Sequence, residues 1–330
     1  MKRLVNLVFC VLLAACAAEV TPKPPIRPAP SPTAAPTKAV ITNYSQASPA
    51  DSLPVTAPSH TPRPTKKPST IVLPALQPTS TLLPNVTPFD VDAWKEQPII
   101  PNVDPSIHAI YQYGQTLGND PHAFSILGDC QERPGEFFGV FETDPAVIDA
   151  LSPELQATVA NFQGSFDRES PTAQDGTTPG ALLWKQWHRG EYGCTFDETP
   201  VQCELRIHRP SFVIIQIGTH FESRNTEYLR TVILQLMDAG VVPILATKAD
   251  NREKDERINR DMWNLASEYD LPLWNFWSAV SDLPNRGLYT RDDRPLQGDI
   301  YLTDEAALRH RITGLEALDA VWRVATDSSQ

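Results

Sequence analysis

Proline is spread unevenly along this 330-residue chain, and its distribution limits what each part can fold into. Seventeen of the 32 prolines lie within residues 21–90, a stretch that contains neither glycine nor tryptophan. Repeated X-Pro steps favour extended, polyproline-like backbone, and too few apolar side chains are left to build a core. We therefore expect residues 17–90 to be a disordered Pro/Thr-rich tether. A Pro-rich recognition arm is the alternative for the same composition.

The first 16 residues have the pattern of a lipoprotein signal peptide. Lys2 and Arg3 are followed by an apolar run that is too short to span a bilayer. Small residues close this run just before Cys16, whose thiol would receive the lipid. We expect residues 1–16 to direct export and Cys16 to anchor the chain to the outer face of the cell membrane. An ordinary cleaved signal with an incidental cysteine is the alternative.

Residues 91–330 contain all fifteen glycines and all seven tryptophans, which suits one folded domain. This part carries 20 Lys and Arg against 37 Asp and Glu. So acidic a domain is a poor partner for nucleic acid or anionic lipid. We therefore expect no nucleic-acid partner, and contact with the membrane only through the lipid.

Short apolar runs alternate with amphipathic stretches along the domain, a pattern typical of a parallel sheet covered on both faces by helices. Strands are expected at 122–127, 211–217, 241–246 and 271–277. Helices are expected from Asp104 and at 145–150, 153–162, 226–239, 256–269 and 315–324. In such sheets the functional site lies at the carboxyl ends of the strands.

Three cysteines follow the tether. Outside the cytoplasm we expect Cys194 and Cys203 to form a disulfide that closes a small loop. Cys130 is then the one thiol without an assigned role.

Three motifs occur in order: Gly128-Asp129-Cys130 and Gly218-Thr219-His220 each follow a predicted strand, and Gly298 to Thr303 lies before the closing helix. With these motifs residues 120–325 resemble the SGNH (GDSL-type) hydrolases. The resemblance implies a three-layer α/β/α flavodoxin-like fold and ester hydrolysis of a carbohydrate or lipid acyl group, with no cofactor and no metal. It places Cys130 at the nucleophile position and His220 at that of the oxyanion asparagine. Tyr301 stands where the base histidine would be, and Asp299 is one place away from its orienting aspartate.

Two interpretations of this pattern stay open. In the first, Cys130 is a nucleophile paired with His220 as thiolate and imidazolium, since a thiol loses its proton more easily than a hydroxyl. In the second, the domain binds a glycan or another small molecule without turnover. A purely structural surface protein is a third class. Either of the first two would use neighbouring residues to bind the ligand or the oxyanion: Gly128, Asp129, Gln131, Gly218, Thr219, Arg168, Asp299 and Tyr301.

The other aromatic and imidazole side chains carry weaker signals. His310 is a candidate for a displaced base, and the remaining histidines lack the spacing of helical zinc ligands. Trp184 and Trp187 are expected in the core or in a lid, with stacking on a sugar ring as the alternative.

Overall fold

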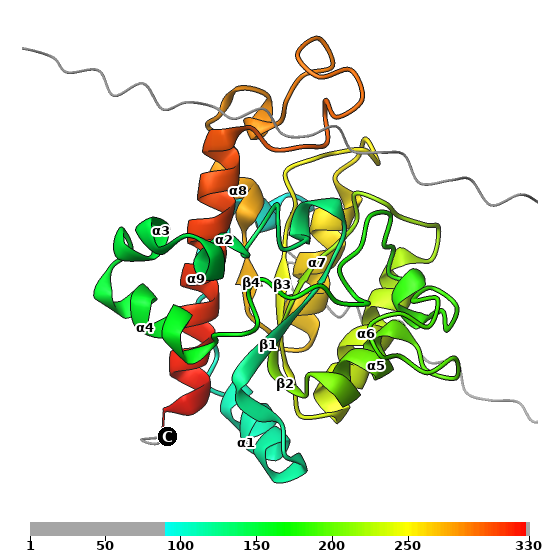
Figure 1. Ribbon diagram of the computed structural model, residues 1–330. Helices are drawn as coiled ribbons and strands as arrows, with labels where there is room; N and C mark the ends of the chain where they lie inside the picture. Colours follow the sequence, from blue (N-terminus) through cyan, green and yellow to red (C-terminus); the bar gives the residue numbers. More distant parts are fainter. Residues whose placement is uncertain (1–89, 328–330) are drawn as a thin grey trace, which may run out of the picture. The chain divides into compact units, whose positions relative to one another are not determined.

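The structure is a computed structural model, and it describes residues 90–327 (Figure 1). The predicted signal peptide and all but the last residue of the predicted tether lie outside these residues, so both stay predictions. Within the described part of the chain, no helix is long and apolar enough to cross a membrane.

A parallel sheet forms the centre of the domain. Its strands lie side by side in the order β1 (Asp120–Gly128), β2 (Pro210–Gln216), β3 (Val242–Ala246) and β4 (Leu273–Trp274). Ile214 in β2 lies opposite Ile126 on one side and Ile244 on the other. The central strands are buried along their whole length, which explains why they appear in the sequence as continuous apolar runs.

Successive residues of each strand point to opposite faces of the sheet, and each face has its own hydrophobic core. Phe212 and Ile214 belong to the core that is completed by α1 (Ile107–Leu117), α4 (Pro153–Asn161) and α9 (Asp304–Thr326). Val213 and Ile215 belong to the core that is completed by α5 (Pro200–Ile207), α6 (Asn225–Asp238) and α7 (Arg257–Glu268). The predicted three-layer α/β/α class is thereby confirmed.

One residue of the long segment between β1 and β2 pairs with the edge of β1 that β2 leaves free. Gly128 forms an isolated parallel bridge with Ala173, and its N–H donates to the carbonyl of Thr172 at 2.9 Å. Gly128 also pairs with Gln216 of β2, so Ala173 lies at the opposite edge. If this bridge is counted as a strand, the order becomes the flavodoxin-like 2-1-3-4-5.

Capping residues explain two differences from the predicted elements. The expected strand at 271–277 stops at Trp274 because the Asn275 side chain accepts from the Ser278 N–H and begins α8 (Phe276–Val280). The closing helix begins at Asp304 rather than near 315, because Thr303 caps it. The remaining elements are short: η1 (Ala93–Glu96), η2 (Cys130–Glu132), α2 (Val140–Thr143), α3 (Pro145–Asp149), η3 (Ala181–Leu183) and η4 (Pro284–Gly287).

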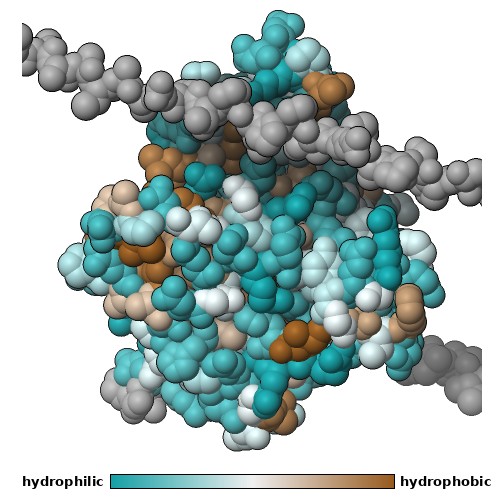
Figure 2. Space-filling view, viewed as in Figure 1, coloured by the Kyte–Doolittle hydropathy of each residue, from teal (hydrophilic) through white to brown (hydrophobic). Residues whose placement is uncertain are grey.

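The face of the domain drawn in Figure 2 is mainly hydrophilic, with small and separate hydrophobic patches. On this face, ligand recognition would fall to local hollows rather than to one broad apolar area.

Candidate active site

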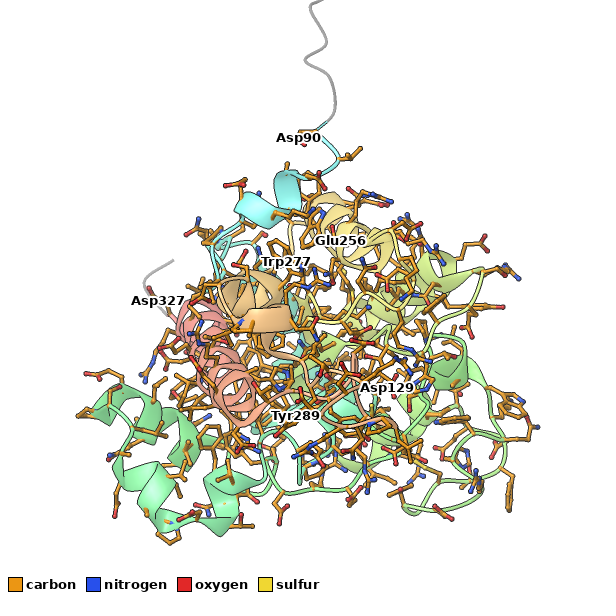
Figure 3. All side chains as sticks on the ribbon, turned by 90° about the horizontal axis from the view of Figure 1, so that it is seen from above. Asp90, Asp129, Glu256, Trp277, Tyr289 and Asp327 are labelled. Carbon is orange, nitrogen blue, oxygen red and sulfur yellow. A yellow bond between two sulfur atoms is a disulfide. The ribbon has the colours of Figure 1, made fainter. Side chains whose placement is uncertain are left out.

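Polar side chains gather where β1 and β2 end. Figure 3 looks down on this edge of the sheet, and Asp129 lies near the middle of the domain in that view. Asp129 and Cys130 directly follow β1, and His220 comes four residues after the end of β2. Neighbouring parallel strands therefore bring the first and second sequence motifs together, as the alternating pattern predicts.

The Asp129 carboxylate joins these segments. Its Oδ1 accepts the backbone N–H groups of Cys130 at 2.7 Å and Gly176 at 3.0 Å. Its Oδ2 accepts from His220 twice, from the backbone N–H at 2.9 Å and from Nδ1 at 2.8 Å. Asp129 is fully buried, so these four donors replace the water that a carboxylate needs. Asp129 thus fixes Cys130, Gly176 and His220 around one charge.

His220 is held in one tautomer by this contact. Because a carboxylate accepts, Nδ1 carries the proton and Nε2 is left as an acceptor. The His220 side chain is 40% exposed whereas Asp129 is 0% exposed, so the imidazole lies between the buried carboxylate and solvent. A buried aspartate behind a partly exposed histidine is the arrangement of a general base with its orienting group.

The Cys130 thiol is buried and protonated. Burial raises its pKa far above the usual range, and the negative charges of Asp129 and Glu132 raise it further. A hydrogen bond with Tyr301 lowers the pKa of the thiol, but burial and the two negative charges have the larger effect. The shift is opposite to that of a thiolate–imidazolium pair. In the structure, Nδ1 of His220 forms its hydrogen bond with Asp129 and not with the thiol.

Tyr301 occupies the place next to the thiol. Burial and the neighbouring Cys130 raise the pKa of its hydroxyl to about 12, so the hydroxyl keeps its proton at neutral pH. A neutral phenol can donate a hydrogen bond to a developing negative charge. The third sequence motif therefore reaches the site through Tyr301.

Glu132 is a site residue that sequence reasoning missed. Its Oε2 accepts the Asp129 N–H at 2.7 Å, and burial raises its pKa well above the usual range. Asp129 and Glu132 form a reciprocal capping box at η2. The signal was present in the sequence, since an acidic cap followed three residues later by Glu predicts this geometry. Gly176 was missed because its contact depends on a loop rather than on a periodic pattern.

Other predicted ligand residues at this edge are engaged in structural contacts. The Gln131 amide donates to the carbonyl of Ile300 at 2.7 Å, which ties the β1 loop to the third motif. The Thr219 hydroxyl donates to Asp250 at 2.7 Å. Gly128 and Gly218 make room: a Cβ at either would lie within 2.4 Å of the Glu132 or Ile258 side chain. Their role in the structure is to shape the site.

Arg168 and Asp299 are not brought to Asp129. Arg168 pairs with the buried Glu204 of α5, and burial lowers the pKa of its guanidinium to about 10. Asp299 forms an ion pair with Arg291 at 2.9 Å in a neighbouring pocket. Within residues 90–327, no group of three or more His, Cys, Asp or Glu is placed to hold a metal ion.

A groove begins beside the Asp129 site. Gly176, which donates to Asp129, lines it together with Trp184, Trp187, Glu222 and Tyr228, and its volume is about 520 Å³. Trp184 is 55% exposed, and its ring centroid lies 6.5 Å from that of Trp187. Glu222 lies two residues after His220 and accepts the Thr178 hydroxyl at 2.8 Å. The groove therefore offers aromatic faces and a carboxylate within one segment of the site.

The disulfide expected from the sequence is present. Cys194 and Cys203 are joined, with their Cα atoms 5.3 Å apart, and Cys130 is the free cysteine among the described residues. The bond fastens the segment that follows Trp184 and Trp187 to α5.

Comparisons with known proteins give similarity in structure only. No sequence-family profile and no curated protein matches the chain. A GDSL-like lipase from Bacteroides thetaiotaomicron is similar, with 14% identity, a TM-score of 0.39, and coverage of 66% of this chain and 98% of the lipase. A variant of an acetyl-xylooligosaccharide esterase from Geobacillus is similar at 15% identity and a TM-score of 0.41, covering 61% and 95%.

Proposed function

We propose that the domain hydrolyses acyl esters, with Cys130 as the nucleophile and His220 as its general base. The observation that supports this most strongly is the Asp129 carboxylate, which binds the backbone of Cys130 through one oxygen and His220 Nδ1 through the other. One carboxylate thus contacts both residues to which the proposal gives a role in the reaction. The raised pKa of the thiol gives the proposed reaction a serine-like form, in which the proton leaves during attack and not before it.

Each step of this reaction has a group to perform it. The Cys130 sulfur attacks the ester carbonyl carbon while its proton passes to His220 Nε2. The departing alcohol takes that proton, which leaves a thioester on Cys130. Water then attacks the thioester with His220 again accepting the proton, and the acid and the thiol are released. The Tyr301 hydroxyl, which hydrogen-bonds the Cys130 thiol, would donate to the negative charge that develops on the sulfur as the proton leaves.

We assign the substrate to acylated carbohydrates rather than to lipids. Trp184, Trp187 and Tyr228 present flat faces on which a sugar ring can stack, and Glu222 can accept hydrogen bonds from ring hydroxyls. A lipid chain would need a longer, wholly apolar channel. Trp184→Ala should therefore weaken turnover of an acetylated sugar and leave turnover of p-nitrophenyl acetate unchanged.

The activity is tested with p-nitrophenyl acetate and with glucose pentaacetate. We expect turnover by the unchanged protein, loss in Cys130→Ala, and partial retention in Cys130→Ser, since a hydroxyl can use the same base. His122→Ala is the matched control for a His220→Ala variant, because His122 is exposed and contacts Asn161 rather than Asp129. Turnover that survives in Cys130→Ala would contradict the nucleophile assignment.

A second function is favoured by the surroundings of the thiol. Burial and two carboxylates raise the pKa of Cys130, and Tyr301 occupies the position where the resemblance implies a base histidine. Binding of a glycan without turnover is therefore the alternative. It predicts that a non-hydrolysable oligosaccharide binds the unchanged protein and Cys130→Ala equally well, while neither releases acetate.

We further propose that the domain works outside the cell on a lipid anchor at Cys16. The support is the apolar run before Cys16 and the absence of glycine and tryptophan from residues 21–90. Metabolic labelling with a radioactive fatty acid in a bacterial host should mark the full chain and not Cys16→Ala. Equal labelling of both would contradict the anchor.

A further inference from the structure

A basic pocket lies beside the Asp129 site in a domain that is otherwise strongly acidic. Arg252, Lys254, Arg286 and Arg291 line a hollow of about 460 Å³ between the loop that follows β3 and the loop that precedes α9. Residues 91–330 hold 20 basic against 37 acidic side chains, so four cations around one hollow are a local reversal of charge. Such a reversal attracts anions.

Two of the four cations are held by neutral groups. Arg252 donates to the carbonyl of Thr219 at 2.9 Å, and Arg286 donates to the carbonyl of Ala249 at 3.1 Å. Backbone carbonyls orient a guanidinium without cancelling its charge. Among residues 90–327, Lys254 forms no ion pair, and Arg286 has only Glu256 at 3.8 Å. Glu256 itself pairs more closely with Lys95, at 2.7 Å.

One carboxylate lines the pocket. Asp299 pairs with Arg291 at 2.9 Å, and both side chains are about half exposed or more. An exposed pair of this kind is weak and can exchange partners. Asp250 lies nearby, but its carboxylate is taken up by the buried Lys248 and by Thr219. The pocket therefore keeps a net positive charge.

The backbone around the pocket is strained. Four of its lining residues have positive φ without being glycine: Lys254 (74°), Asn285 (48°), Arg286 (51°) and Asp299 (63°). Nine such residues occur in the described part of the chain, so almost half of them line this one hollow. Strain of this kind is concentrated at ligand sites, where the surrounding structure must impose it.

We propose that this pocket binds a phosphoryl group on the ligand of the Asp129 site. Guanidinium groups match the oxygens of phosphate in pairs, and several fixed cations suit a dianion better than a carboxylate. Arg252 contacts Thr219, which precedes His220, and Asp299 lies two residues before Tyr301. The pocket therefore adjoins the site on two sides. The inference rests on the proposed function for the identity of the ligand and names its class: a phosphorylated sugar ester.

Binding is measured by calorimetry at low salt in full-length Cys130→Ala, so that the result is independent of turnover. The probes are inorganic phosphate, glucose 6-phosphate, glucuronate and glucose. We expect glucose 6-phosphate to bind and inorganic phosphate to compete with it, with glucuronate weaker and glucose weakest. Arg286→Gln should weaken glucose 6-phosphate at least about tenfold. Arg291→Gln tests the same pocket from an exposed position, in case Arg286→Gln does not fold.

Arg230→Gln is the control, because it removes the same charge from α6, where Arg230 pairs with Glu268. It should bind glucose 6-phosphate as the parent protein does. The proposal is overturned if glucose 6-phosphate does not bind, if glucuronate binds more tightly, or if the two pocket variants bind like Arg230→Gln. If the unchanged protein has no esterase activity but the pocket still binds glucose 6-phosphate, only the proposed hydrolysis is overturned.

Discussion

Two histidines lie near the carboxyl ends of the strands, and they have opposite surroundings. His220 rests on the Asp129 carboxylate and is partly open to solvent. His310 in α9 is buried, lies against the rings of Phe137 and Phe276, and forms its hydrogen bond with the neutral amide of Gln216, at 2.5 Å. Burial lowers the pKa of His310 to about 3. Of these two histidines, only His220 therefore combines a carboxylate partner with access to solvent.

The largest expected effect separates the two histidines by activity. We expect His220→Ala to lower the rate of ester hydrolysis by about 10²- to 10⁴-fold, the usual contribution of a general base. His310→Phe should keep the rate of the unchanged protein, since His310 has no access to substrate. Steady-state kinetics on p-nitrophenyl acetate measures both. A comparable loss in both variants would break the comparison.

The second effect is on stability in acid. The folded-state pKa of His310 is about 3, below the unfolded value of about 6.5, so the unfolded state binds more protons between these limits. The unfolding free energy should therefore fall as the pH decreases from 6.5 to 3, by about 1.4 kcal/mol per pH unit from this residue alone. Urea unfolding followed against pH should show a shallower slope in His310→Phe. An unchanged slope would contradict the assignment of the acid sensitivity to His310.

A smaller effect concerns the thiol. Alkylation of Cys130 by iodoacetamide should be slow at neutral pH and rise about tenfold per pH unit without a plateau below pH 9, because the raised pKa keeps the thiolate scarce. Asp129→Asn removes one neighbouring negative charge and should speed the reaction by about tenfold. A plateau near neutral pH in the unchanged protein would restore the thiolate–imidazolium interpretation.

The smallest effect is expected at Tyr301. Tyr301→Phe removes one hydrogen bond to Cys130 while keeping the ring, and a neutral hydrogen bond contributes about 1 kcal/mol. We expect hydrolysis to slow by about fivefold with little change in KM. A much larger loss would make Tyr301, and not His220, the group that handles the proton.

Much of the fold was predictable because its elements are strongly patterned. The apolar runs of β1, β2 and β3 and the amphipathic stretches of α6 and α7 fall within two residues of their predicted bounds. Short elements were harder to predict, since the end of β4 and the start of α9 depend on the single capping residues Asn275 and Thr303.

The site was predictable only where it follows a strand. The motifs at Asp129 and His220 meet because parallel strands end at one edge, and this could be inferred from the sequence. The hydrogen-bond partners of each group could not be inferred from the sequence, because they depend on loop conformation. Gly176, for example, contacts Asp129 from a segment with no periodicity. The protonation of Cys130 depends on burial and on two carboxylates, which no local spacing reveals.

The disulfide between Cys194 and Cys203 has a consequence for the order in which the domain is completed. Together with the hydrogen bond of 3.0 Å from His188 to the Glu198 carbonyl, it fixes the segment that follows Trp184 and Trp187. In a reducing cytoplasm this segment would lack its covalent closure. The sheet and the Asp129 cluster contain neither of these cysteines, so they can form before the bond does. On the export proposed above, the bond would close this segment only after the chain has left the compartment where it was made.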